Sequence, residues 1–129
     1  MRDPKNELTI SVMEPSTSKT ANFNSTVIDT QQYIGSMAVV LNAGAKTAGD
    51  AGDTTLNVRL MHSAESNGAN ATNCNINFTQ VTTTNSLQTV AYNPREFSGR
   101  YLKAVGVIAG TNSPAFPVGI SILGTKKLQ

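Results

Sequence analysis

Two residue types that could carry nucleophilic or general-base chemistry occur once each. His62 is the sole histidine and Cys74 the sole cysteine in 129 residues. A nucleophilic thiol needs a base or a cation beside it, and nothing in Asn73-Cys74-Asn75 marks the thiol as activated. His62 continues the apolar alternation of the run that it ends. We therefore interpret His62 as a boundary residue with a half-covered ring and Cys74 as an ordinary free thiol, and we expect no catalytic residue.

Carboxylates offer a second kind of chemistry. Asp50 and Asp53 share a glycine-rich loop over residues 43–53, and together with Glu65 they could present oxygen ligands to a hard cation. The alternating ligand pattern of a calcium loop is absent, and eight acidic residues are a thin supply for the paired carboxylates of a glycosidase. Neither a phosphate-binding loop nor a dinucleotide glycine pattern occurs. The sequence favours a solvated loop and predicts no metal and no cofactor.

Basic residues gather toward the carboxyl end. Between residues 97 and 129 there are four cations and no carboxylate: Arg100, Lys103, Lys126 and Lys127. The net charge of +2 is small, so this run is typical of a solvated surface, and we expect no direct binding to nucleic acid. No stretch approaches 18 apolar residues, which predicts no membrane span. A single cysteine and no signal-peptide core predict synthesis in a reducing cytoplasm.

The elements that must position these residues are short strands. Hydrophobic residues make up 39% of the chain and charged residues only 14%, while Thr, Asn and Ser fill 40 positions. Short β-type runs alternate with Gly, Asn, Asp, Ser and Pro, and no window shows sustained helical spacing. The sequence predicts an all-β, antiparallel β-sandwich that is jelly-roll-like. Its seven expected strands are 26–30, 36–42, 55–62, 75–82, 87–92, 101–109 and 118–124.

Two of these runs, 37–41 and 105–109, are apolar on both faces, whereas 55–62 alternates between apolar and polar residues. A strand that is apolar on one side is buried once, by the opposite sheet. A strand that is apolar on both sides predicts a second cover on its outer face. We expect that second cover to come from other chains.

The first 23 residues differ from the rest. They contain two prolines, a polar cluster over residues 15–20 and one apolar alternation at Leu8, Ile10 and Val12. We predict an N-terminal arm over residues 1–23, with an edge strand, and a β-sandwich domain over residues 24–129. Two placements remain open for the arm: it crosses onto a neighbouring subunit, or it folds back on its own domain.

Four stretches resemble small virion proteins of tailed bacteriophages. They are Leu56–Ala64, Phe78–Thr83, the run Arg100-Tyr101-Leu102-Lys103 continued to Gly110, and Ile122–Lys127. The resemblance covers about residues 24–127. It implies a β-sandwich capsid decoration or cementing subunit that stabilises the assembled phage head and is located on the virion surface. The implied partners are the major capsid protein and further copies of the chain, in a homo-oligomer that is a trimer or larger.

A different class of function suits the same fold. Jelly rolls also serve as lectins, so the alternative is a carbohydrate- or receptor-binding module of a phage fibre or spike. Its candidate contacts are Tyr33, Tyr92, Asn67 and Asn112. A small hydrolase is the third possibility, and the single histidine and the few carboxylates disfavour it. We predict a structural protein that is not an enzyme.

Overall fold

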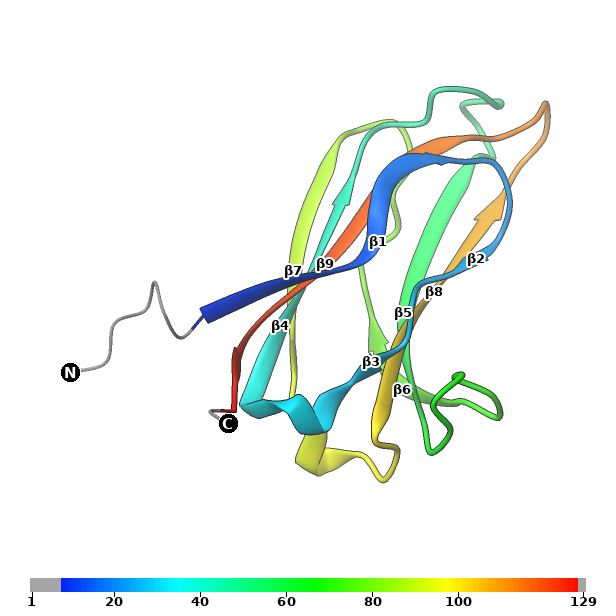
Figure 1. Cartoon of the computed structure of the whole chain (residues 1–129). Helices are drawn as coiled ribbons and strands as arrows, with labels where there is room; N and C mark the ends of the chain where they lie inside the picture. Colours follow the sequence, from blue (N-terminus) through cyan, green and yellow to red (C-terminus); the bar gives the residue numbers. More distant parts are fainter. Residues whose placement is uncertain (1–7, 128–129) are drawn as a thin grey trace.

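Two antiparallel sheets pack face to face in the computed structural model, which describes residues 8–127 (Figure 1). Two single-turn 3-10 helices, η1 (Thr30–Gln32) and η2 (Pro94–Glu96), lie at one end of the sandwich. The strands are β1 (Leu8–Lys19), β2 (Phe23–Asn24), β3 (Ile28–Asp29), β4 (Tyr33–Ala43), β5 (Thr55–Ser63), β6 (Thr72–Asn77), β7 (Ser86–Tyr92), β8 (Tyr101–Ala109) and β9 (Phe116–Lys126).

The strand order identifies the topology. One sheet runs β1-β9-β4-β7, and the other runs β2-β8-β5-β6, with β3 also pairing with β8. If β2 and β3 are taken as one interrupted strand, the eight strands follow the jelly-roll order: consecutive strands lie in opposite sheets except β5 and β6, which pair with each other. The predicted all-β, jelly-roll-like sandwich is therefore confirmed.

Strand alternation builds the core between the sheets. On β9 every second residue from Phe116 to Gly124 is buried, and on β5 the same holds for Leu56, Val58 and Leu60. The predicted one-sided burial of β5 is thus confirmed. Apolar side chains from both sheets interdigitate here, which provides the main driving force for folding.

Most of the predicted strands occur, and β8 has the predicted bounds. The expected strand 75–82 lies earlier, at Thr72–Asn77. Asn75 adopts a positive φ of 59° where the register shifts between Leu60 and Met61; pairing resumes at Ile76 and ends at Asn77. After Asn77 the chain keeps two isolated contacts with β5: Phe78 N donates to Val58 O, and Val81 forms a β-bridge with Leu56.

Most of the predicted arm that the structure describes lies on its own domain. β1 pairs with β9 from Leu8 to Lys19, and Met13 is fully buried in the core. β2 crosses the predicted boundary at residue 24, and the Phe23 ring covers Gly106 of β8. Residues 1–7 of the predicted arm lie outside the described residues.

Long loops close the end of the sandwich away from the two 3-10 helices (Figure 1). The segments 43–54 and 110–115 are hydrogen-bonded to each other there: Thr47 N donates to Ala115 O, and Asp50 N donates to Thr111 O. The long loop between β5 and β6 lies at the other end. Within residues 8–127, no helix has the length and apolar character needed to cross a membrane.

Candidate functional site

The outer face of the β1-β9-β4-β7 sheet presents rows of small and aliphatic side chains. The pairing places Ile10 beside Leu123, Leu123 beside Ala38, and Ala38 beside Ala91. A second row contains Val12, Ser121, Val40 and Thr89 in the same way. Since side chains on one face are two residues apart along each strand, the rows continue above and below. We call this surface the A face. Its residues are Leu8, Ile10, Val12, Ile34, Ala38, Val40, Asn42, Leu87, Thr89, Ala91, Gly119, Ser121, Leu123 and Thr125.

All large aliphatic side chains that are exposed within residues 8–127 belong to the A face. Ile10 and Leu87 are 72% and 73% exposed, and they lie on its opposite edge strands. The other three are Leu8, Val12 and Ile34. No A-face residue carries a formal charge. Scattered exposed aliphatic residues are normal, but a contiguous uncharged group on one sheet is typical of an interaction surface.

A groove of about 500 Å³ crosses the A face between β1 and β4. Register shifts on either side of Glu14 lift β1 away from regular pairing, and Ser16 then lies over Gly119, where a Cβ atom would be 3.2 Å from the Ser16 Cβ. Glu14 is buried beside the groove and forms an ion pair with Lys19. The lining is Val12, Glu14, Pro15, Ser16, Val40, Asn42, Gly119 and Ser121.

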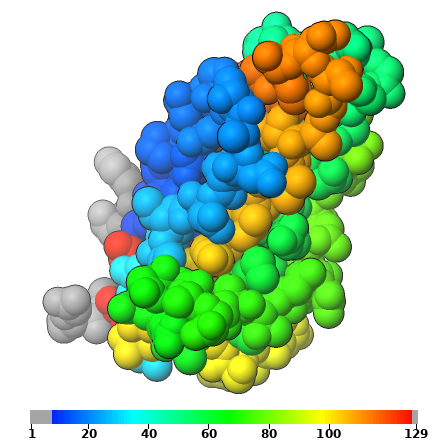
Figure 2. All heavy atoms as spheres, turned by 90° about the vertical axis from the view of Figure 1, so that its right-hand side faces the viewer, coloured from blue at the N-terminus to red at the C-terminus, as the bar shows by residue number. Residues whose placement is uncertain are grey.

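The outer face of the second sheet is different. It carries Arg59 on β5 and Lys103 on β8, and the chain's own loop lies against it. A Cβ atom on Gly68 would be 2.9 Å from Val27 and 3.3 Å from the Lys103 side chain. Figure 2 shows the loop around Gly68 in green, below the orange diagonal of β8. This face is charged and partly covered already.

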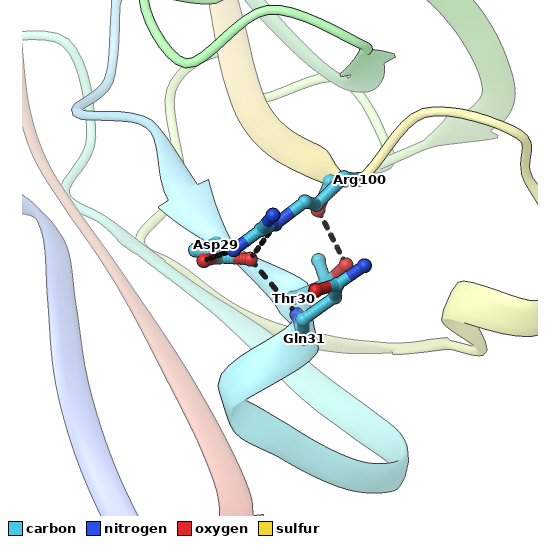
Figure 3. Close-up of polar contacts among 4 residues, drawn as sticks. All are labelled: Asp29, Thr30, Gln31 and Arg100. Carbon is cyan, nitrogen blue, oxygen red and sulfur yellow. Dashed lines mark hydrogen bonds and ion pairs between the residues drawn. The ribbon is translucent and has the colours of Figure 1, made fainter.

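A cleft of about 340 Å³ opens at the end of the sandwich that holds the two 3-10 helices. Arg100 spans one wall: its Nε donates to Asp29 Oδ1 at 2.9 Å and its Nη2 to Asp29 Oδ2 at 2.7 Å (Figure 3). Asp29 also caps η1 by accepting from Gln31 N at 3.0 Å. The hydrogen bonds from Arg100 hold the pKa of Asp29 below its usual value. Arg100 thus ties η1 to the start of β8.

None of the residues that line this cleft is a carboxylate or a histidine, so they contain no acid–base pair for catalysis. Lys127, one of the four basic residues singled out from the sequence, lines the cleft together with Arg100. Lys126 lies 6.0 Å from the centre of the Tyr33 ring, and Lys103 lies on the second sheet. The four cations therefore do not form one patch.

His62 and Cys74 lie where the sequence interpretation puts them. His62 is partly buried; its Nδ1 accepts from Gly99 N at 3.1 Å, and its ring is 5.2 Å from that of Phe97. Cys74 is buried, and burial raises the pKa of its thiol to about 11. A nucleophile needs the opposite shift. No hydrogen bond between described residues joins the two side chains.

The three acidic residues considered as cation ligands lie at opposite ends of the sandwich. The Asp50 and Asp53 carboxylates both accept from the Thr111 hydroxyl, at 2.7 and 2.9 Å, while Asn112 donates to Asp50. Hydrogen bonds from Asn112 and Thr111 lower the pKa of Asp50. Glu65 belongs to the loop at the other end of the sandwich. Among residues 8–127, no cluster of three or more potential metal ligands forms.

The four residues predicted as glycan contacts do not come together, and this prediction is wrong. Tyr33 and Tyr92 are 3% and 0% exposed, so neither ring can stack on a sugar. Tyr33 packs over Gly124, and Tyr92 stacks on Phe97 with ring centres 5.0 Å apart. Asn67 and Asn112 stabilise turns at opposite ends of the sandwich.

The A face was only partly foreseen. The outward, half-buried positions of Ala38 and Val40 agree with the prediction that β4 is apolar on both faces. The outward direction of Leu8, Ile10 and Val12 was missed, because alternation identifies a strand without saying which side meets the core. The lack of charge at these positions was the available signal.

Comparisons with known proteins give little further guidance. No family model matches the chain, and no curated protein matches it. A solved structure described as "CBM4 structure and function" aligns with a TM-score of 0.41 and 14% identity, over 96% of this chain and 92% of that one. A likeness at this level establishes no shared function.

Proposed function

We propose that the chain is a non-catalytic structural subunit that docks its A face onto an assembled protein shell. The observation that carries this proposal is the confinement of every exposed large aliphatic residue of the described chain to one uncharged sheet face. We take the shell to be a phage head on the basis of the resemblance of the sequence to small virion proteins. The chain then acts as a decoration or cementing subunit on the virion surface.

The lack of charge on the A face favours docking against protein. Burying a charge costs several kcal/mol unless a partner compensates for it, whereas burying apolar surface contributes about 25 cal/mol for each Å². The centres of protein interfaces are correspondingly depleted in charged residues. Covering the A face removes Ile10, Val12 and Leu87 from water, and Glu14, which lines its groove, is already buried and paired with Lys19.

A subunit that binds only the assembled shell stabilises that shell through mass action. Each bound copy lowers the free energy of the assembled state, and the effect is repeated at every equivalent site. No chemical step is needed. This fits a chain whose sole histidine accepts a backbone hydrogen bond and whose sole cysteine is buried with a raised pKa.

The test adds purified protein to heads assembled from the major capsid protein alone and measures bound protein and head melting temperature. We expect saturable binding and a higher melting temperature. Val40→Lys places a charge at the centre of the A face and is expected to weaken binding by more than about tenfold. Val107→Lys is the matched control, since Val107 lies on the outer face of the second sheet and is also half-buried.

Absence of saturable binding by the unmodified chain would refute the cementing role. Equal loss of binding in both lysine variants would instead refute docking through the A face. Circular dichroism of each free variant confirms that the sandwich is intact before it is mixed with heads.

A further inference from the structure

The two sheets of this molecule differ in how their edges are protected from pairing with another strand. A sheet edge carries unpaired N–H and C=O groups that can pair with another strand, and natural sheets block their edges with bulges, charges, short strands or covering segments. The second sheet follows this rule. One edge is divided into the two-residue strands β2 and β3, and the other, β6, contains a register shift and the positive-φ residue Asn75.

The β1-β9-β4-β7 sheet lacks such protection along two segments, β7 and the first five residues of β1, whereas β1 from Met13 onward has register shifts around Glu14 and a covering segment. β7 pairs with β4 in unbroken register over seven residues, from Ser86 to Tyr92, and carries no charge. No backbone–backbone hydrogen bond from another described segment reaches its outer side, although the Gln88 side chain bonds the backbone N and O of Thr79 at 2.7 and 2.8 Å. Its side chains on the A face, among them Leu87, are exposed.

The opposite edge is similar over its first five residues. Leu8–Val12 of β1 pairs with β9 in unbroken register and also lacks charge and proline. The outer side of β1 becomes covered only at Met13, whose carbonyl accepts from Thr26 N at 2.9 Å and from Thr26 Oγ1 at 2.7 Å. Within the described chain, Leu8–Val12 is an open edge with Ile10 and Val12 exposed.

The directions of the two open edges are complementary. Three antiparallel pairings separate β1 from β7, so the two strands run in opposite directions within one sheet. When a second copy is placed beside the first by translation in the plane of the sheet, its β7 lies antiparallel to β1. The antiparallel pattern of the sheet then continues across the junction. Neither edge segment carries a charge that would repel the other.

We propose that copies of this chain associate edge to edge, with Leu8–Val12 of one copy hydrogen-bonded to β7 of the next. The joined sheets form one continuous outer face made of several A faces. This inference deepens the proposed function, because it names the contact between neighbouring subunits that together cover a shell. Such an interface uses two different surfaces on each copy, so it permits rings of three or more copies.

Disulfide trapping tests the arrangement. In a Cys74→Ala background, Ile10→Cys is combined in turn with Leu87→Cys, Thr89→Cys or Ala91→Cys, all of which lie on the A face of an edge strand. Directly opposite residues on neighbouring antiparallel strands have Cβ atoms about 4.5–5.5 Å apart, within reach of a disulfide after small adjustments. We expect one of the three pairs to give covalent oligomers larger than dimers on mild oxidation at high protein concentration.

Two controls separate this contact from random collision and from a symmetric one. Ile10→Cys with Asn77→Cys pairs β1 with the edge strand of the other sheet and is expected to stay monomeric. Ile10→Cys alone would give only dimers, and abundant dimers from it would overturn the β1–β7 contact in favour of β1 pairing with itself. Sedimentation velocity of the unmodified chain provides the untrapped measurement, in which we expect the mass to rise with concentration.

A strictly monomeric chain at high concentration, together with no ladder from any of the three pairs, overturns the proposal. Such a result leaves the docking of the A face to be judged by the binding assay on heads. Conversely, a chain that forms ladders but does not bind heads keeps the edge contact and loses the cementing role. The failures of the two proposals are therefore distinguishable.

Discussion

At the scale of single residues, two buried tyrosine hydroxyl groups differ in their partners. The Tyr33 hydroxyl donates to Ser11 Oγ at 2.9 Å. The Tyr92 hydroxyl has no hydrogen-bond partner among the described residues. Its polar neighbour is the Cys74 thiol, a weak hydrogen-bonding group, and burial raises the pKa of Tyr92. The two hydroxyls should therefore contribute oppositely to stability.

We predict that Tyr33→Phe lowers the free energy of unfolding by about 1 kcal/mol, since it removes a hydrogen bond. Tyr92→Phe should leave the free energy of unfolding unchanged or raise it by up to about 1 kcal/mol, because it removes a buried unpaired group. Urea unfolding of both variants measures the difference. A larger loss for Tyr92→Phe than for Tyr33→Phe would contradict this assignment of partners.

The raised pKa of Cys74 predicts how the free energy of unfolding changes at alkaline pH. Burial raises the pKa of its thiol from 9.0 to about 11 in the folded state, so the folded chain holds the proton more tightly than the unfolded chain. The stabilisation is complete below pH 9 and is lost as the pH rises toward 11. Cys74→Ala should flatten the fall in unfolding free energy between pH 9 and 11. An equally steep fall in that variant would assign the effect to other groups, such as Tyr92.

Asp29 predicts the opposite response at acid pH. The hydrogen bonds from Arg100 lower its pKa in the folded state, so its stabilisation is present above the ordinary pKa of about 3.9 and disappears as the pH falls through the lowered value. The pair is partly exposed, so Asp29→Asn should lower the unfolding free energy by no more than about 1 kcal/mol at pH 7. The difference should shrink as the pH falls below that ordinary value, and thermal unfolding at pH 7 and at acid pH checks it.

The surroundings of His62 could be predicted from the sequence, whereas those of Tyr33 and Tyr92 could not. The half-covered ring of His62 followed from its place in the alternation of β5. Tyr33 and Tyr92 were named as glycan contacts only under the alternative hypothesis, because they flank turns, and the structure turns both rings inward. The Tyr33 ring packs over Gly124 of β9, and the pairing of β4 with β9 shifts register between Ile34 and Ala38. Both features depend on a strand that is far along the sequence. Local spacing cannot report such contacts.

At the scale of elements, β8 illustrates what alternation can and cannot predict. Its bounds match the prediction, but the role of its central Gly106 depends on β2. A Cβ atom at Gly106 would lie 2.3 Å from the Phe23 ring, so this ring fits only because the side chain is absent. The short strand β2 and its pairing with β8 rest on that contact, which links segments more than 80 residues apart. The sequence alone gave no sign of it.

We predict that Gly106→Ala displaces the Phe23 ring and lowers the unfolding free energy by about 1–3 kcal/mol. Gly52→Ala is the matched control, because nothing lies within 4 Å of its Cβ position. Thermal unfolding compares the two variants with the parent chain. Equal melting temperatures for the two variants would show that Phe23 moves aside without cost and that β2 contributes little to the fold.

At the scale of the whole molecule, the two sheets have different outer surfaces. The second sheet is charged, has interrupted edges and is partly covered by its own loop. The β1-β9-β4-β7 sheet has an uncharged face with exposed aliphatic residues, and each of its edges has an open segment within the described chain, Leu8–Val12 of β1 and the strand β7. The sequence predicted that other chains cover apolar strands. The structure shows that the A face and the open edge segments belong to one sheet. This could not be predicted without the strand order.

The accessibility of single cysteines on the two outer faces tests docking through the A face most directly. In the Cys74→Ala background, Val40→Cys reports on the A face and Val107→Cys on the second sheet, and each is alkylated in the free chain and again after the chain is added to undecorated heads. Docking through the A face predicts that alkylation at position 40 slows by more than about tenfold on the heads while position 107 reacts as before. Unchanged alkylation at position 40, or protection at position 107 instead, would contradict it.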